Sequence, residues 1–188
     1  MNKYSNFSFI ISGSLGAGKT TAASYISQKY GYQHLSFVGE IWKPILRERG
    51  LEINRENLQS LGIELMNSIG PAKIVEILLD KAIPYNRIVI DDVRRKDVVE
   101  IIKELSLNVF LVYINVDFKT RYPRLVKRDK IKSEEDQLKA EAVETETAIP
   151  ELKSIANYII NNSGNLNSFY ASIDEAILIA ETQFKNVE

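Results

Sequence analysis

The chain has 188 residues, 45% of them hydrophobic and 26% charged, and its 24 Lys and Arg against 25 Asp and Glu leave a formal net charge of −1 at pH 7. This length and composition support one globular domain with a full core. The near-neutral charge disfavours a protein whose main function is to bind duplex nucleic acid. The sequence contains no cysteine, which excludes disulfides, thiolate nucleophiles and cysteine-based zinc sites.

No apolar segment is long enough to cross a membrane. The longest apolar runs, such as VFLVYINV at 109–116, fall short of the roughly 20 residues that a membrane helix requires. The amino terminus lacks the sustained apolar stretch and the small-residue cleavage site of a secretion signal. We therefore expect a cytoplasmic protein, and the absence of cysteine fits a reducing compartment.

Short apolar runs alternate with amphipathic stretches along the whole chain. In chain order we expect a strand at 6–12, a helix at 19–30, a strand at 34–37, helices at 39–50, 55–70 and 71–82, a strand at 87–92, a helix at 95–105, a strand at 108–116, a basic segment at 117–129, a charged helix at 133–147, a strand at 157–162 and a helix at 166–184. Strands separated by helices predict an α/β fold with a parallel five-stranded sheet and helices on both faces.

The segment GSLGAGKT, residues 13–20, fits the phosphate-loop pattern G-x-x-x-x-G-K-[ST] and lies between a predicted strand and a predicted helix. Its glycines permit a tight curve whose backbone N–H groups converge on phosphate oxygens. Lys19 would bring a positive charge to the β and γ phosphates, and the Thr20 hydroxyl would ligate Mg²⁺. The residues expected to bind nucleotide here are Gly13, Ser14, Gly16, Ala17, Gly18, Lys19, Thr20 and Thr21.

The run RIVIDD, residues 87–92, ends in two carboxylates, at the end of the strand where a magnesium partner is needed. Either Asp91 or Asp92 could be the Mg²⁺ partner. Asp91 follows the apolar run directly and is preferred for Mg²⁺ through water, which leaves Asp92 nearer the acceptor. One of the pair is also expected to cap the helix that follows. The only histidine, His34, is expected to pack or hydrogen-bond beside the second strand, because transfer to a phosphate oxygen needs no strong base.

Basic residues follow two of the strands, as phosphoryl transfer requires. Arg94 lies just after the two aspartates, and Arg124 and Arg128 are four residues apart and share a helical face. Arginines on a closing lid stabilise charge that develops in the transition state. Pro123 is expected to interrupt a helix that starts at Asp117, so that the lid begins later or bends. The neighbouring residues Lys127, Lys130 and Lys132 are expected to be solvated.

These motifs, in this order, resemble those of the nucleoside monophosphate kinases and are most similar to the adenylate kinase-like and dephospho-coenzyme A kinase-like branch. GSLGAGKT is followed by HLSFVGEIWKPILRERG, similar to the acceptor helix G-D-x-x-R, and by IDDVRR, similar to D-G-x-x-R. RLVKR is similar to the lid motif R-L-x-x-R, and SIANYIINNSGNLNSF is similar to A-D-Y-x-I-x-N-x-G-x-L. The resemblance covers nearly the whole chain.

The resemblance implies roles for five further side chains. It assigns Arg124 to the adenine of the donor, Arg128 to phosphate contacts from the lid, and Arg94 to the acceptor phosphate. On the acceptor helix, Glu40 takes the place of the acid and Lys43 the place of the arginine. A lysine lacks the bidentate fork of an arginine, so it would contact a phosphate as a point charge.

Three aromatic residues leave two alternatives open. Tyr32, Phe37 and Trp42 either line an acceptor-base pocket by stacking or belong to the core.

The resemblance implies a single P-loop NTPase domain over 1–188, with acceptor-binding helices at about 39–83 and a helical lid at about 121–147. The expected enzyme transfers the γ-phosphoryl group of ATP, with Mg²⁺, to a nucleoside or deoxynucleoside monophosphate. One alternative is a dephospho-coenzyme A kinase acting on the ribose 3′-hydroxyl, and another, from a different class, is a nucleotide-binding regulatory ATPase module. The expected partner is a small-molecule nucleotide acceptor, and the oligomeric state is left open.

Overall fold

The computed structural model describes residues 7–106, 108–129 and 149–185, apart from the side chains of residues 128, 129, 150 and 185. The charged helix expected at 133–147 lies outside these residues. In chain order the elements are β1 (Phe7–Gly13), α1 (Lys19–Tyr30), β2 (Gln33–Ser36), the π-helical turn η1 (Val38–Trp42), α2 (Lys43–Glu48), α3 (Arg55–Ser68), α4 (Gly70–Asp80), β3 (Arg87–Asp91), α5 (Lys96–Leu105), β4 (Asn108–Asn115), α6 (Phe118–Asp129), α9 (Ile149–Ser154), β5 (Tyr158–Asn161) and α10 (Leu166–Lys185).

The five strands form one sheet in the order β2-β3-β1-β4-β5, and every neighbouring pair is parallel. This confirms the predicted parallel sheet. Because the strands are parallel, their carboxyl ends meet at one edge, where ligands bind in such folds. The last residues of the strands at that edge are Gly13, Ser36, Asp91, Asn115 and Asn161.

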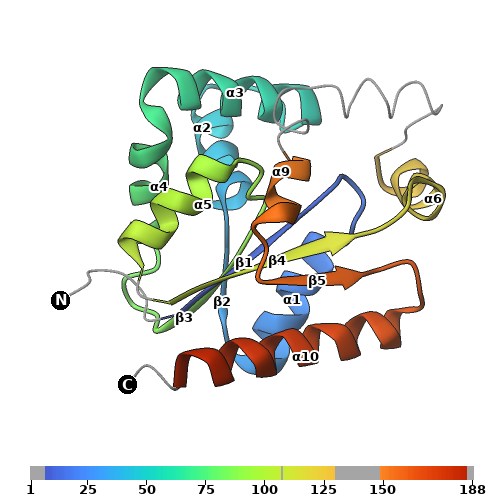
Figure 1. Cartoon of the computed structure of the whole chain (residues 1–188). Coiled ribbons are helices and arrows are strands. Elements are labelled where there is room, and N and C mark those ends of the chain that lie inside the picture. Colours follow the sequence, from blue (N-terminus) through green and yellow to red (C-terminus); the bar gives the residue numbers. More distant parts are fainter. Residues whose placement is uncertain (1–6, 107, 130–148, 186–188) are drawn as a thin grey trace.

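Helices cover both faces of the sheet (Figure 1). One face packs against α1 and α10, and the other packs against the layer that contains α4, α5 and α9. Alternate residues of β1 serve the two layers: Phe9 and Ile11 belong to the α1 and α10 core, whereas Ile10 belongs to the opposite core. A central strand buried on both faces needs the continuous apolar run seen in the sequence.

The three aromatic residues with two alternatives all belong to the core. Tyr32 is 2% exposed and meets the Phe7 ring edge to face at 5.8 Å. Trp42 is 6% exposed and stacks on Phe37, with ring centroids 6.0 Å apart. None of the three lines the pocket described below, and their burial assigns them to the core.

The predicted acceptor helix at 39–50 differs from a regular helix. Its first part is the π-helical turn η1, in which the N–H of Lys43 bonds to the carbonyl of Val38, five residues back. Proline at 44 has no N–H to offer the carbonyl of Glu40 and crowds it, which favours a widened turn. Glu40 therefore lies in the π-helical turn and Lys43 at the start of α2, so the two residues of the predicted acceptor helix do not belong to one regular α-helix.

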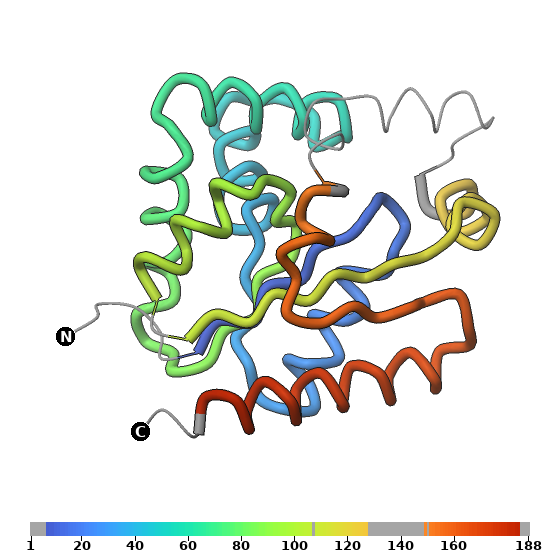
Figure 2. The backbone as a smooth tube through the Cα atoms, in the orientation of Figure 1, coloured from blue at the N-terminus to red at the C-terminus, as the bar shows by residue number. Residues whose placement is uncertain are grey.

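Helix α6 runs without interruption from Phe118 to Asp129, although Pro123 lies inside it. The expectation that Pro123 would break this helix was wrong. Both flanks of the proline are fixed: Asp117 Oδ1 accepts a hydrogen bond from Thr120 N at 2.7 Å, and Leu125 is fully buried. The helix can therefore tolerate one missing backbone hydrogen bond. Figure 2 shows α6, the loop after β1 and the loop after β5 at the same end of the sheet.

Candidate active site

The loop between β1 and α1 has a conformation that requires glycine. The φ angles of Gly13, Gly16 and Gly18 are +147°, +76° and +101°, in the region that side chains disfavour. A Cβ atom on Gly13 would lie 2.6 Å from the carbonyl oxygen of Ile114, and one on Gly18 would lie 2.7 Å from the amide of Asn162. The predicted phosphate loop is thus a close-packed turn with no space for side chains at these positions.

The loop ends at the amino terminus of α1, where anions bind well. Gly18 is the N-cap of α1 and supplies no side-chain cap to the first turn. The N–H groups of that turn and the positive end of the helix dipole are suited to a phosphate. Lys19 is 7% exposed, and its Nζ donates to the carbonyls of Gly13 at 2.7 Å and Ser14 at 3.1 Å. The ammonium group therefore lies over the loop, where bound phosphates would meet it.

Two other elements hold the loop in place. Asn162, just after β5, donates from Nδ2 to the carbonyl of Ala17 at 2.8 Å, and its own carbonyl accepts from Arg124 Nη2 at 3.0 Å. From α6, Arg121 Nη1 donates to the carbonyl of Leu15 at 3.3 Å. Asn162 was not among the predicted site residues, although its place in the motif after the last strand is the signal that points to it.

Thr20 and Asp91 form the oxygen pair expected for a metal. Thr20 Oγ1 donates to Asp91 Oδ2 at 2.8 Å, and His34 Nε2 lies 3.0 Å from Asp91 Oδ1. Asp91 is 1% exposed, so its carboxylate is held in one orientation. Hydroxyl and carboxylate oxygens are ligands that Mg²⁺ prefers, and the pair fits a magnesium ion bound mainly through phosphates and water. The interaction with Asp91, opposed by burial, raises the pKa of His34 above 6.5.

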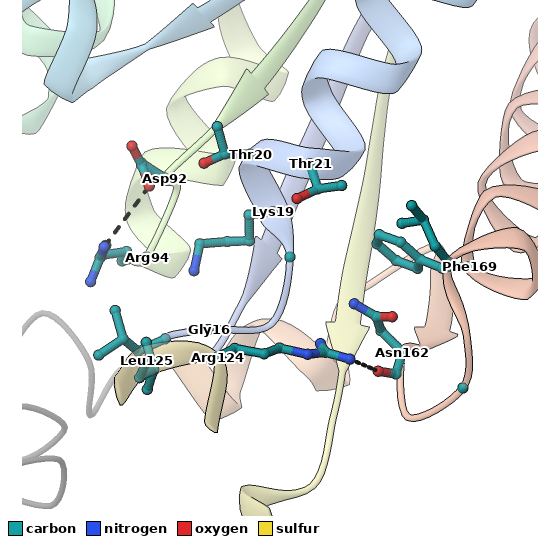
Figure 3. A pocket seen from close by; sticks show the side chains of 14 residues that line it. Gly16, Lys19, Thr20, Thr21, Asp92, Arg94, Arg124, Leu125, Asn162 and Phe169 are labelled. Atoms are coloured by element: carbon teal, nitrogen blue, oxygen red, sulfur yellow. Dashed lines mark hydrogen bonds and ion pairs between the residues drawn. The ribbon is translucent and has the colours of Figure 1, made fainter. Parts of the chain in front are cut away.

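A pocket of about 440 Å³ lies over the loop (Figure 3). Figure 3 shows Asp92 and Arg94 at one end, Lys19 between the two ends, and Asn162 and Phe169 at the other end. The pocket is lined by Leu15, Gly16, Gly18, Lys19, Thr20, Thr21, Asp92, Arg94, Arg124, Leu125, Asn162, Gly164, Leu166 and Phe169. We call the end with Asp92 and Arg94 the acceptor end.

The acceptor end combines a carboxylate and a guanidinium group. Arg94 Nη2 lies 3.9 Å from Asp92 Oδ1, and the backbone of Asp92 has a φ of +66°. Burial raises the pKa of Asp92, and the neighbouring charge of Asp91 acts in the same direction, while Arg94 and Lys19 oppose the rise.

Neither aspartate caps α5, contrary to the expectation from the sequence. The N-cap of α5 is Arg95, which offers no side-chain cap, and Asp97 Oδ1 accepts the hydrogen bond from Val98 N. Arg95 itself pairs with Asp97 through two hydrogen bonds. Both strand-end aspartates are therefore available to the site, because the chain takes three further residues to reach the helix.

The remaining predicted residues divide into three groups. Gly13, Ser14 and Ala17 belong to the phosphate loop without lining the pocket. Glu40 and Lys43 do not line it either, although the charge of Glu40 helps to raise the pKa of His34. Arg128 lies in α6, and its side chain is outside the described residues, as is most of the predicted lid.

Among the described residues, no helix is long and apolar enough to cross a membrane. Within the same part of the chain there is also no cluster of three or more His, Cys, Asp or Glu side chains that would form a metal site by themselves. A magnesium ion at Thr20 and Asp91 would therefore depend on a bound nucleotide for most of its ligands.

Residues 10–148 match a sequence family described as "AAA domain". The chain is also 30% identical over 155 residues to a UPF0200 protein of Pyrobaculum aerophilum, a match that covers 81% of this chain and 85% of the relative. The chain belongs to the AAA domain family and to the UPF0200 family. A second UPF0200 protein, from Aeropyrum pernix, is 24% identical over 173 residues, which cover 90% of this chain and 91% of the relative.

Solved structures of small-molecule kinases share the fold of this UPF0200 protein. A sugar kinase from Janibacter superposes with a TM-score of 0.59 at 13% identity and covers 93% of each chain. A shikimate kinase from Bacteroides thetaiotaomicron gives a TM-score of 0.57 at 18% identity, over 93% of this chain and 98% of that one. These likenesses confirm the P-loop kinase fold and leave the acceptor undetermined.

Proposed function

We propose that this protein is an ATP-dependent phosphotransferase that moves the γ-phosphoryl group of ATP to a small-molecule acceptor. The observation that carries the proposal is that the phosphate loop and the acceptor end line one continuous pocket. Lys19 and Thr20 serve the donor phosphates, and Arg94 and Asp92 lie where an acceptor would approach the γ phosphate. A protein that only bound or hydrolysed nucleotide would not need these two side chains there.

The chemistry follows from positions and charges. Backbone N–H groups of the loop and the first turn of α1 bind the phosphates, and Lys19 offsets charge on the β and γ phosphates. Mg²⁺, held through Thr20 and Asp91, would supply further neutralisation of the charge that develops between those phosphates. Burial of the phosphate loop under α6 excludes water from part of the site, which strengthens these electrostatic interactions.

The end of the pocket opposite Arg94, beside Asn162 and Phe169, suits a nucleoside. Leu166 and Phe169 offer apolar surface, Gly164 leaves room, and Arg124 spans from α6 to the carbonyl of Asn162. A guanidinium plane favours stacking on an aromatic base. We therefore assign Arg124 to the donor base, and Arg128, on the same helix, to the phosphates when the lid closes.

Two acceptor classes have support from a specific residue. A nucleoside or deoxynucleoside monophosphate is supported by Arg94, whose charge at the acceptor end suits a phosphate. A ribose 3′-hydroxyl, as in dephospho-coenzyme A, is supported by Asp92, which offers a hydrogen-bond acceptor at the same place. A regulatory ATPase module, the alternative from another class, gives no role to either residue. A cytoplasmic location, where ATP is abundant, fits each of these activities.

The test is a phosphotransfer assay with purified protein, ATP, Mg²⁺ and a panel of acceptors. The panel contains nucleoside monophosphates, dephospho-coenzyme A and simple alcohols, and both ADP and the phosphorylated product are quantified. Formation of both in equal amounts with one acceptor class supports the proposal. ADP formation that does not depend on any acceptor would instead identify a regulatory ATPase, and absence of turnover would contradict both.

A further inference from the structure

We propose that Asn162 is a positioning residue for the donor phosphates: its side-chain amide locks the peptide between Ala17 and Gly18 in the orientation that offers the Gly18 N–H to them. This inference rests on the proposed function and adds a residue to the donor half of the pocket. It is carried by the contacts of Asn162, by the planarity of the peptide and by the backbone of Gly18.

The backbone of Asn162 is fixed from two sides. Its N–H donates to the carbonyl of Asn115, at the end of β4, at 2.8 Å, and its carbonyl accepts from Arg124 on α6 at 3.0 Å. The residue is 6% exposed. The amide that reaches the phosphate loop therefore extends from a backbone that both the sheet and α6 hold in place.

This amide contacts one particular peptide of the loop. Asn162 Nδ2 donates to the carbonyl of Ala17 at 2.8 Å, and Ala17 is fully buried. A buried backbone carbonyl is costly to leave without a partner. The side chain also fills the space beside Gly18, where a Cβ atom would lie 2.7 Å from Nδ2. Asn162 thus supports the loop from the side of the pocket opposite Arg94 (Figure 3).

A held carbonyl fixes the N–H on the other side of the same peptide. A trans peptide is planar, so the Ala17 carbonyl and the Gly18 N–H point in opposite directions. The φ of Gly18 is +101°, and glycine changes the sign of φ at little cost, so this peptide could turn over if nothing held it. Turned over, it would present a carbonyl oxygen to the phosphates, and the two negative groups would repel. The hydrogen bond from Asn162 opposes this alternative.

Gly18 lies where the direction of an N–H matters for a phosphate. It lines the pocket and is the N-cap of α1, directly before Lys19 and Thr20, which are proposed to serve the donor phosphates. Backbone N–H groups at a helix amino terminus bind phosphate best when all of them converge on it. Asn162 therefore acts on the phosphates through Ala17, although it lies at the end of the pocket that suits the nucleoside.

The test compares Asn162→Ala and Asn162→Leu with wild type and with Asn161→Ala as a matched control. Alanine removes the amide, leucine removes it while keeping a side chain of similar size, and neither adds a charge beside an anion. Asn161 is the adjacent residue of the same type. It is exposed, does not line the pocket, and accepts a hydrogen bond from Ser163 N at 3.2 Å.

The ligands are ATP and inorganic tripolyphosphate, which has no base, each with Mg²⁺. Isothermal titration calorimetry gives the Kd of each, and circular dichroism and thermal unfolding check that each variant folds. A purely structural role of Asn162 would lower the unfolding temperature and leave both Kd values of the folded protein unchanged.

We expect both Asn162 variants to raise the Kd of ATP by about 10-fold, the scale of one lost hydrogen bond. The Kd of tripolyphosphate should rise by the same factor, because the effect is on the phosphates and not on the base. Asn161→Ala should keep both Kd values within about twofold of wild type, as an exposed substitution usually does.

Three results would overturn the inference. One is a wild-type Kd for ATP in the folded Asn162 variants. Another is weaker binding of ATP with unchanged binding of tripolyphosphate, which would mean that Asn162 serves the base. The third is a wild type that binds ATP but not tripolyphosphate, because the loop would then not be held ready for phosphates. Failure of wild type to bind ATP would instead overturn the proposed phosphotransferase function itself.

Discussion

His34 Nε2 lies 3.0 Å from one oxygen of the buried Asp91 carboxylate, and the other oxygen accepts a hydrogen bond from Thr20. Three elements, β2, β3 and α1, thus fix one carboxylate. Since Asp91 and Thr20 are proposed to hold Mg²⁺, His34 would act as a positioning residue for the metal site.

We predict that His34→Leu raises the Mg²⁺ concentration needed for half-maximal activity by about 10-fold, the usual scale for loss of an outer-shell partner. Binding of Mn²⁺ to the ADP complex, followed by electron paramagnetic resonance, should weaken in parallel, while metal-free ADP binding is unchanged. His34→Gln should recover part of the loss. Unaltered Mn²⁺ binding in His34→Leu would show that the contact with Asp91 has no role in the metal site.

Lys19→Met should lower kcat by at least about 100-fold, because the ammonium group stabilises phosphate charge in the transition state. The fold should persist, since Lys19 contacts loop carbonyls rather than the apolar core. Circular dichroism and thermal unfolding check the fold, and Lys127→Met, on the exposed face of α6, is the control for loss of one lysine. A folded Lys19→Met enzyme with normal turnover would contradict the phosphate-loop assignment.

Arg124 and Arg128 should differ in their effects although both lie on α6. Arg124 lines the pocket and holds the carbonyl of Asn162, so Arg124→Ala should chiefly raise the KM for ATP, by about 10-fold for one lost charged contact. Arg128→Ala should chiefly lower kcat, since its proposed contact forms with the transferring group. Steady-state kinetics separate the two, and wild-type behaviour of both variants would mean that α6 contributes only a solvated basic surface.

Arg94 and Arg95 form a matched pair of adjacent arginines. Arg94 lines the acceptor end, whereas Arg95 pairs with Asp97. Arg94→Ala should raise the acceptor KM by roughly 10- to 100-fold, the scale of a lost charged contact, and leave the Kd of ATP almost unchanged. Arg95→Ala should leave both quantities near wild type. Equal effects of the two substitutions on acceptor kinetics would argue against an acceptor site at Arg94.

Asp117 connects the start of α6 to the loop after β5. Hydrogen bonds from the Thr120 side chain and backbone, and then from Ser163, lower the pKa of Asp117 from 3.8 to about 2. A lowered pKa means that the folded state favours the ionised form. Its stabilising contribution is therefore complete above about pH 4 and is lost as the pH falls toward 2.

Asp117→Asn keeps a capping side chain but does not titrate. We expect the difference in free energy of unfolding between wild type and this variant, from urea denaturation, to be largest at neutral pH and to shrink between pH 4 and pH 2. A difference that stays constant over this range would show that ionisation of Asp117 does not contribute to the pH dependence of the free energy of unfolding.

Much of the fold and the centre of the site could be predicted from the sequence, because they depend on local rules. The glycines of residues 13–20 and Lys19 are recognisable by spacing, since phosphates impose a tight backbone curve wherever they bind. Continuous apolar runs predicted the parallel strands, because both faces of the sheet are covered by helices. The direction of parallel strands then predicted that Asp91 and the loop after β1 would meet at one edge.

Only the tertiary structure decided which neighbouring side chains enter the pocket. Arg94 and Arg95 are adjacent and chemically identical, and the path of the chain from Asp92 into α5 turns the first toward the pocket and pairs the second with Asp97. Asn162 reaches Ala17 across 145 residues of sequence, which no local pattern encodes. Local composition determines where strands and loops form, whereas the backbone angles and the packing of distant segments determine which side chain faces the ligand.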